Sequence, residues 1–430
     1  MINRREFIKQ TSMATASMIV APSIIPSGRL FAPTGARLAN HVVFCLFAGG
    51  IRNFESIGKA EGNLLPHLLK GNETISKSIS AGIDPFPISS EISPLQNHGT
   101  FYANFRYGAK NTLHYAAHAA AIMGNYVPNV QLMKPLNHPT IFEYYRKHTS
   151  PSKSATSAWW ISDQAGPFTF LNYSDFPGYG PLYGANMLQP TSYFNTLLNG
   201  QHDFTSTEEI NISNLQLFFN QHAQIQKNQL THTQVNNTIE DRKKIELALS
   251  SLNKEYTTQD FNPWGVGKAV NEDILTMYAA INVLKTFKPE LLVVNMQHSD
   301  IGHSNFTKYC NNMHKADFAL GQLWQTIQST PGLADDTVLI AAPEFGRDLQ
   351  PNTIIDQYGK YAVDHTGDDN SQKIFCMIAG PEKIVVQNQY INDLKGETID
   401  IVPTIAKILG FYDQIPKGRL TGRFLEDAFY

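Results

Sequence analysis

Four largely apolar runs of strand length constrain the fold of this chain more than any other feature. Segments of helical length, such as Glu272–Lys285 and Phe306–Gln328, precede two of these runs. Fully apolar runs fit strands that are buried on both faces of a parallel sheet, and intervening helices imply right-handed crossovers. We therefore expect an α/β fold with a mostly parallel, doubly wound sheet. The four runs are His41–Phe47, Leu291–Met296, Thr337–Ala342 and Lys373–Ala379.

Polar side chains follow the first three runs and precede the fourth. Ligands of open α/β sheets bind beyond the carboxyl ends of the strands, so these side chains are the first candidates for a site. A lone Asp after a strand is more often a helix cap or a turn former, so only the coincidence of several such side chains indicates a site. The candidates are Arg52, Asn53, Glu55, His298, Asp300, His303, Glu344, Arg347, Asp348, Asp364 and His365.

The mixture of carboxylates and imidazoles among these candidates suits a divalent metal ion. Zn²⁺, Mn²⁺ and Fe²⁺ accept such ligands, and Ca²⁺ is a further candidate because it prefers carboxylates. The metal ligands we expect are Glu55, Asp300, His303, Glu344, Asp364 and His365. The identity and the number of the ions stay open.

The N-terminus has the features of an export signal. A segment with paired arginines, Asn3–Lys9, precedes the uncharged stretch Gln10–Ser27, and this order resembles the twin-arginine signal that exports folded proteins. We therefore expect a signal over residues 1–39, cleaved between Ala32 and Ala39, and a periplasmic or secreted protein. An amphipathic helix and an uncleaved anchor are the alternatives, and we expect no later transmembrane segment.

The remaining sequence, residues 40–430, fits one α/β domain with an insertion over residues 150–265. Residues 150–200 are rich in Gly, Pro, Tyr, Trp and Asn, and the polar stretch that follows favours helices near 215–227 and 236–252. We interpret the insertion as a cap on the main sheet, which either shapes a substrate entrance or is a plain structural lid.

Charge and cysteine content exclude several classes of protein. Lys and Arg number 34 and Asp and Glu 37, so the net charge of −3 offers no basic footprint for a nucleic acid. The 3 cysteines, Cys45, Cys310 and Cys376, are odd in number and widely spaced, so we expect buried free thiols rather than disulfides or a thiolate metal site. No G-x-G-x-x-G follows a strand, which argues against a dinucleotide-dependent oxidoreductase.

An ordered series of motifs resembles a known family. Asp300-Ile-Gly-His303, Glu344-Phe-Gly-Arg347, Asn352 and Asp364-His365 follow one another as in the sulfatase-like, twin-arginine-exported branch of the alkaline phosphatase superfamily, which has no assigned reaction. Further matching segments bring the resemblance to roughly residues 41–125 and 290–425. They are Gly49–Glu55 with Lys59, His114 and His118 ahead of Gly124, and Thr398–Gly410.

The resemblance implies an α/β/α sandwich with metal ions at the strand ends. In well-understood members two ions hold a phosphate or sulfate ester that a Ser, a Thr or a modified Cys attacks. Glu55 takes the place of the first acidic ligand, Asp300 and His303 that of an Asp/His pair, and His365 that of the last histidine. Glu344 falls where the superfamily has an Asp followed by His, but here Phe345 follows and cannot bind a metal.

The position of the nucleophile departs from the family pattern. It holds His114, and Thr112 lies two residues earlier. Three alternatives follow: His114 acts as nucleophile or acid/base, a metal-activated water attacks, or the site only binds. His118, one helical turn from His114, is either a functional residue or a structural one.

The roles of two further residues, Arg347 and Asp364, stay open. Arg347 either clamps an anionic oxygen or pairs with Glu344 or Asp348. Asp364 orients His365, binds the metal with it, or is a solvated acid. We therefore expect a metal-dependent hydrolase of small-molecule or glycan phosphate, sulfate or related esters. The alternative is a catalytically degenerate exported binding or assembly protein on the same fold.

Overall fold

The structure is a computed structural model, and it describes residues 36–71, 73–84, 92–110, 112–127, 136–149, 153–162, 171–190, 235–256, 262–266 and 270–430. The predicted export signal, except for its last residues, lies outside the described residues, as does the helix predicted near 215–227. The export signal therefore stays a prediction.

The described residues form one sheet of 8 strands in the order β4-β3-β5-β1-β6-β7-β2-β8. Strand β7 runs antiparallel to both of its neighbours, and every other neighbouring pair is parallel. The mostly parallel sheet is confirmed. The strands are β1 His41–Phe47, β2 Gly99–Arg106, β3 Ala158–Ser162, β4 Asn186–Leu188, β5 Leu291–Met296, β6 Thr337–Pro343, β7 Lys373–Ala379 and β8 Gln389–Ile391.

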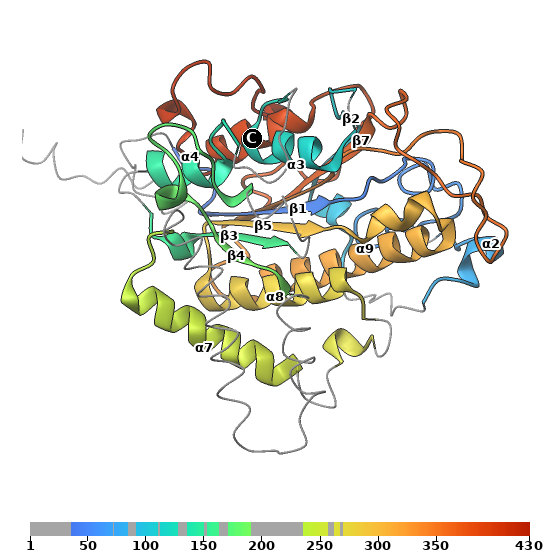
Figure 1. The fold of residues 1–430 in the computed structure, drawn as a ribbon, viewed down its shortest axis with the longest axis horizontal. Coiled ribbons are helices and arrows are strands. Elements are labelled where there is room, and N and C mark those ends of the chain that lie inside the picture. Colours follow the sequence, from blue (N-terminus) through green and yellow to red (C-terminus); the bar gives the residue numbers. More distant parts are fainter. Residues whose placement is uncertain are drawn as a thin grey trace, which may run out of the picture.

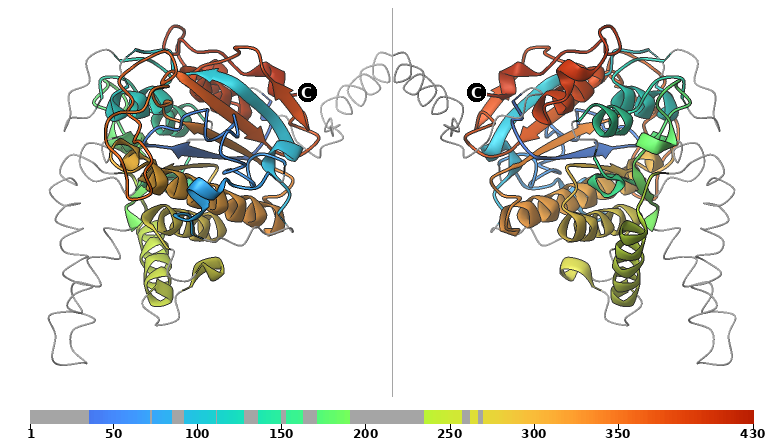
Figure 2. Two further views of the ribbon diagram at one scale, coloured as in Figure 1. Left: turned by 90° about the vertical axis from the view of Figure 1, so that its right-hand side faces the viewer. Right: turned by 90° about the vertical axis from the view of Figure 1, so that its left-hand side faces the viewer.

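Helices cover both faces of this sheet, so the three-layer α/β/α sandwich is confirmed (Figures 1 and 2). Alternate side chains of β1 enter opposite cores: Val43, Cys45 and Phe47 pack on the side of α8 and α9, and Val42 packs on the side of α3, α4 and α10. The helices are α2 Lys77–Ser80, α3 His114–Met123, α4 Ile141–His148, α7 Ile239–Tyr256, α8 Glu272–Phe287, α9 Phe306–Ser329 and α10 Ile401–Ile408.

Local sequence sets the ends of the helices that flank the site. The side chains of Asn271 and Asn305 cap α8 and α9 by accepting hydrogen bonds from main-chain N–H groups three residues later, at 3.0 and 2.8 Å. Gly124 ends α3 with φ +69°, a left-handed conformation that favours glycine. These caps fix where α9 leaves the site and how far α3 extends from it.

The segment that we interpreted as an inserted cap differs from that prediction in one respect. Within it, β3 and β4 are strands of the main sheet, and all of β3, including Trp159 and Trp160, is buried. The helix predicted near 236–252 corresponds to α7, which packs against α8 through Ile245 and Leu252. Much of the rest lies outside the described residues, so the role of a cap stays a prediction.

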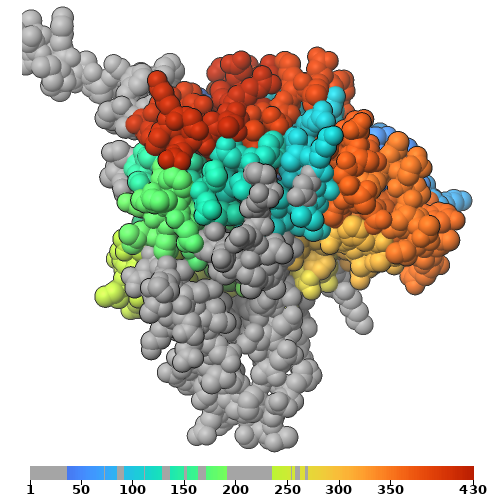
Figure 3. Space-filling model, turned by 45° about the horizontal axis from the view of Figure 1, so that its top comes forward, coloured from blue at the N-terminus to red at the C-terminus, as the bar shows by residue number. Residues whose placement is uncertain are grey.

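The carboxyl end of the sheet gathers segments from five strands. Strands β1, β5, β6 and β2 all end at this edge, and β7, which runs the other way, begins there. In the space-filling view the surface of β2 and α3 (cyan to teal) adjoins the segment between β6 and β7 (orange) (Figure 3). The Thr112 hydroxyl, ahead of α3, donates to the carbonyl of His365 at 2.6 Å and joins these two segments.

The cysteines and the helices agree with the remaining expectations about the chain. Cys45, Cys310 and Cys376 are buried free thiols, as predicted. Among the described residues, no helix combines the length and the apolar character needed to span a bilayer.

Candidate metal centre

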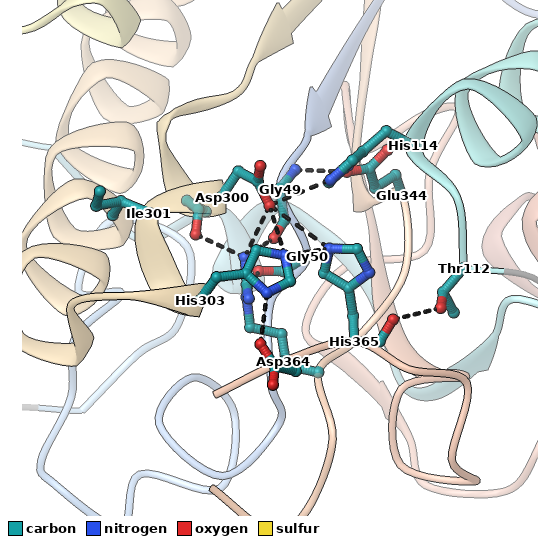
Figure 4. A network of polar contacts seen from close by, with 12 residues as sticks. Gly49, Gly50, Thr112, His114, Asp300, Ile301, His303, Glu344, Asp364 and His365 are labelled. Carbon is teal, nitrogen blue, oxygen red and sulfur yellow. Dashed lines mark hydrogen bonds and ion pairs between the residues drawn. The ribbon is translucent and has the colours of Figure 1, made fainter. Parts of the chain in front are cut away.

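Four side chains from three parts of the chain converge at this edge. His114 begins α3, Asp300 and His303 lie in the 3-10 turn His298–His303 after β5, and His365 lies in the loop before β7. One ligand atom from each residue lies within 4.8 Å of the others. Figure 4 shows the three imidazole rings turned toward the Asp300 carboxylate. The structure thus brings together four of the residues that the sequence singled out.

The distances in this cluster fit a metal ion. Asp300 Oδ1 lies 3.2 Å from His114 Nε2, 3.3 Å from His303 Nε2 and 3.5 Å from His365 Nε2. A tetrahedron with metal–ligand bonds of about 2.0–2.1 Å has edges of about 3.3 Å. The Nε2 atoms of His303 and His365 are somewhat closer, at 2.8 Å. Three imidazoles and one carboxylate are a donor set that Zn²⁺ and similar ions accept.

Two carboxylates hold the imidazoles in this orientation. His303 Nδ1 donates to Asp364 Oδ1 at 2.6 Å, and His114 Nδ1 donates to Glu344 Oε1 at 2.7 Å. Such bonds fix the tautomer of a metal-binding histidine and leave its Nε2 free for the metal. Asp364 therefore orients His303, whereas the sequence suggested His365 as its partner.

His365 is held mainly through its main chain. Its carbonyl accepts the bond from Thr112, and its side chain is 9% exposed. Its Nδ1 has no hydrogen-bond partner among the described residues. Thr112, which we expected near the chemistry, is itself buried and supports His365 from behind.

The electrostatics of the cluster follow from these contacts. Burial alone would raise the pKa of Asp300, but hydrogen bonds from His114, His303 and His365 hold it well below its usual range. The hydrogen bond to Asp300 raises the pKa of His303. Burial opposes the protonation of His114, yet Glu344 and Asp300 raise its pKa to about 10. The metal-free cluster therefore retains protons that a cation would displace.

Arg347 joins the loops that carry the cluster. Its side chain is fully buried and donates to the carbonyl oxygens of Gly50 at 3.1 Å, Val363 at 2.7 Å, Ser299 at 2.9 Å and Gly49. Its charged partner is Asp300, at 3.3 Å. The loops after β1 and β5 and before β7 thus meet on one guanidinium group. Its N–H groups bond to carbonyl oxygens and to Asp300 of the protein itself.

Three glycines permit this close approach. A Cβ at Gly302 would lie 2.7 Å from Arg347 Cζ, which explains why a glycine separates Asp300 from His303. A Cβ at Gly49 would lie 2.2 Å from Asp300 N, and Gly49 and Gly50 have φ of +89° and +78°. Larger residues at these positions would push the loops apart.

The structure places Glu55 outside the cluster. Its buried carboxylate is bound by Arg52, whose Nε donates to Glu55 Oε2 at 2.9 Å. Arg52 Nη1 also donates to the carbonyl of Leu349 at 2.8 Å. Burial raises the pKa of Glu55, and the bonds from Arg52 offset part of that effect. The acid that the resemblance gave as the first ligand is thus held in an ion pair.

His118 lies behind His114, in the interior. Its Nδ1 is 2.7 Å from both the His114 carbonyl and Glu344 Oε2, and its Nε2 is 2.9 Å from Asn295 Oδ1. The Nδ1 atom thus faces two acceptors, the carbonyl oxygen and the carboxylate. His118 is fully buried and supports the cluster from the inside.

Sequence reasoning missed two polar residues of this network. Asn295 is buried in β5 and donates to Ser162 Oγ at 3.0 Å. An amide inside the otherwise apolar run Leu291–Met296 was the available signal, because a buried polar group needs a partner. Nothing in the sequence around Ser162 marks it as that partner.

Comparisons with known proteins show the fold. No protein-family model matches the sequence, and no curated protein is significantly similar to it. A four-substitution variant of the alkaline phosphatase PafA has 10% identity, covers 93% of this chain and 100% of its own, and gives a TM-score of 0.50.

Two other solved structures are less similar in shape. A protein in the alkaline phosphatase superfamily from Vibrio parahaemolyticus has 11% identity. The match covers 95% of this chain and 76% of that protein, with a TM-score of 0.42. A 2-O GAG sulfatase has 11% identity. The match covers 91% of this chain and 73% of the sulfatase, with a TM-score of 0.45.

Proposed function

Because the chain has an alkaline phosphatase-like α/β fold, we propose that it is an exported, metal-dependent hydrolase of phosphate, sulfate or related esters. The observation that carries the proposal is the convergence of His114, Asp300, His303 and His365 at the carboxyl edge of the sheet. Ligands of such sheets bind at that edge. Small-molecule and glycan esters are the substrates we propose.

The cluster would hold a divalent cation through three Nε2 atoms and Asp300 Oδ1. When bound, the cation supplies positive charge that stabilises the oxygens of an ester as negative charge develops on them. The Asp300 side chain is 47% exposed and that of His303 is 40% exposed, so a substrate can reach the cluster from solvent. Helix α3 begins at His114, so its positive end also favours an anionic substrate.

The other residues of the network keep the cluster in place. Glu344 orients His114, Asp364 orients His303, and Arg347 fixes the loops. None of the four clustered residues carries a hydroxyl or a thiol. Both nitrogens of the His114 imidazole face carboxylates, Nδ1 that of Glu344 and Nε2 that of Asp300 at the cation site. We therefore assign the attack on phosphorus or sulfur to water, whose proton leaves with the alcohol product, and not to a side chain of the cluster.

Turnover of a panel of p-nitrophenyl esters tests this proposal. The phosphate, phosphonate and sulfate esters are offered to the purified protein before chelation, after chelation and after addition of Zn²⁺, Mn²⁺ or Ca²⁺. We expect turnover that chelation removes and one of the ions restores, and that Asp300→Ala abolishes. Asp413→Ala, at an exposed carboxylate paired with Lys407, is the matched control and keeps full activity. Turnover that survives both chelation and Asp300→Ala would contradict the proposal.

A binding or assembly protein is the second candidate. The observation in its favour is the same lack of a hydroxyl or thiol among the four clustered residues. It predicts that the metal-loaded protein binds a phosphate or sulfate ester and turns over none of the panel. Metal-restored turnover would exclude it.

Export is tested separately from catalysis. We expect the full-length chain in the periplasmic fraction of bacterial cells, and the double change Arg4→Lys with Arg5→Lys to retain it in the cytoplasm. An unchanged distribution of the double variant would argue against the twin-arginine route.

A further inference from the structure

Glu344 occupies a closed position beside the cluster. Its side chain is fully buried, and its Oε1 accepts hydrogen bonds from His114 Nδ1 at 2.7 Å and from Gly49 N at 2.5 Å. Its Oε2 lies 2.7 Å from His118 Nδ1. Glu344 meets His114 at Nδ1, whereas Asp300 meets it at Nε2, on the other side of the ring. The carboxylate therefore lies behind the imidazole and outside the group of atoms that could share one ion.

The neighbours of Glu344 also fail to offer a second set of ligands. The ring of Phe345 packs against His114 and His365, with ring centroids 5.2 and 4.4 Å apart. Gly49 brings only its main chain to Glu344. Among the described residues, one group of His, Cys, Asp or Glu side chains is arranged to hold a metal ion, and it consists of His114, Asp300, His303 and His365.

We infer that the site takes one divalent cation per chain, and that Glu344 is a positioning residue for His114 and not a metal ligand. This inference rests on the metal binding in the proposed function. It also separates two tasks that a carboxylate can have here: Asp300 faces the cation, and Glu344 holds the ring that faces it. An outer carboxylate of this kind changes metal affinity by about 10–100-fold.

The number of bound ions tests the inference without any measurement of turnover. The metal-free wild-type protein is titrated with Zn²⁺ in competition with a chromophoric chelator, and the bound metal is counted by elemental analysis. We expect one Zn²⁺ per chain. Glu344→Gln is expected to keep that count with a dissociation constant raised about 10–100-fold.

A spectroscopic measurement distinguishes positioning from ligation. Co²⁺ absorbs visible light more strongly with four ligands than with six, so its spectrum reports the ligand set. At saturating Co²⁺ we expect Glu344→Gln to give the wild-type spectrum, since all four ligands remain, and His114→Ala to change it.

Glu143→Gln is the matched control, because Glu143 is another fully buried carboxylate, in the first turn of α4, and is bonded to Thr140, Ser174 and Gly180. It is expected to leave both the metal affinity and the spectrum unchanged. If Glu344→Gln does not fold, the count on the wild-type protein still decides how many ions the site takes.

The outcomes that overturn the inference are distinct. Two Zn²⁺ per wild-type chain, or a Glu344→Gln variant with fewer bound ions and a changed Co²⁺ spectrum, would overturn the inference and leave the proposed hydrolase intact. A wild-type protein that binds no divalent metal would overturn both. One ion per chain without ester turnover would support the inference and count against the hydrolase.

Discussion

Histidine–carboxylate contacts occur both beneath α9 and at the carboxyl edge of the sheet, and they differ in burial and in the number of imidazoles that meet one carboxylate. On the side of α9, Asp317 accepts bonds from His67 Nδ1 at 3.0 Å, His67 N at 2.9 Å and Leu68 N at 2.8 Å, and it is fully buried. At the carboxyl edge, one oxygen of the half-exposed Asp300 faces three imidazole nitrogens.

The difference teaches what distinguishes a structural pair from a metal site. Both carboxylate oxygens of Asp317 accept hydrogen bonds from His67 and Leu68, which are neighbours in one short loop. Asp317 therefore fixes the position of that loop against α9. The Asp300 cluster instead places several lone-pair donors at one point, where either protons or a cation must separate them. Convergence of donors, and not burial, marks the candidate metal site in this comparison.

The largest expected effect is that of Asp300→Ala on metal affinity. The change removes a ligand, so Zn²⁺ binding should weaken by more than about 100-fold, the upper end for loss of an outer partner. Competition with a chromophoric chelator measures it. Wild-type affinity in this variant would erase the distinction between the two clusters.

Asp317→Ala should affect folding and leave the metal site unchanged. It strands two main-chain N–H groups and His67 in the core, so the free energy of unfolding should fall by about 3 kcal/mol. Urea denaturation measures the loss, and a Zn²⁺ titration at a temperature where the variant is folded provides the contrast. A weakened Zn²⁺ affinity would show that the two regions are coupled.

Asp364→Asn should weaken Zn²⁺ binding by about 10–100-fold, because His303 loses its charged acceptor. The side chain is 32% exposed, so the free energy of unfolding of the metal-free protein should change by no more than about 1 kcal/mol. If the free energies of unfolding and of Zn²⁺ binding fell by equal amounts, Asp364 would have a structural role like that of Asp317.

The pH dependence should be the smallest effect and should have opposite signs with and without metal. The pKa of His114 is raised to about 10, so its contribution to the stability of the metal-free protein is full below about pH 6.5 and is lost as the pH rises toward 10. Zn²⁺ must displace that proton, so its affinity should rise by up to about tenfold per pH unit for each proton released.

Thermal unfolding at pH 7 and pH 8, with and without saturating Zn²⁺, tests this pair of signs. The metal-free protein should become less stable between these values, while the stabilisation by Zn²⁺ should grow. Calorimetry in buffers of different ionisation enthalpy counts the released protons, and a count of zero would contradict the raised pKa of His114.

Four apolar strands of the fold could be predicted from the sequence, and the other four could not. Strand β2 was missed despite its 8 residues, because Thr100, Asn104 and Arg106 interrupt its apolar residues. The runs at β1, β5, β6 and β7 are buried on both faces, so their continuous apolar sequence itself predicts a strand. Strands β4 and β8 have three residues each, and β3 lies in a stretch rich in Gly, Pro and aromatic residues. Their assignment to the sheet depends on neighbours distant in sequence, which no local pattern records.

The same limit applies to the candidate site. Asp300, His303 and His365 were expected as ligands because they lie next to predicted strands, whereas His114 was expected at the site only through the family resemblance. The direction of a carboxylate depends on its partner. Glu55 turns to Arg52, three residues away, and Glu344 turns to histidines more than 200 residues away.

The reversed direction of β7 has a consequence for how this protein can diversify. The chain leaves β6 and enters β7 at the same end of the sheet, so the whole connection between Pro343 and Lys373 stays on one rim. A connection of this kind can lengthen, shorten or change composition without passing a new crossover over either layer of helices. Most of that rim segment can therefore be exchanged without disturbing the sheet, provided that Glu344, Arg347 and the short stretch Asp364–His365 are kept.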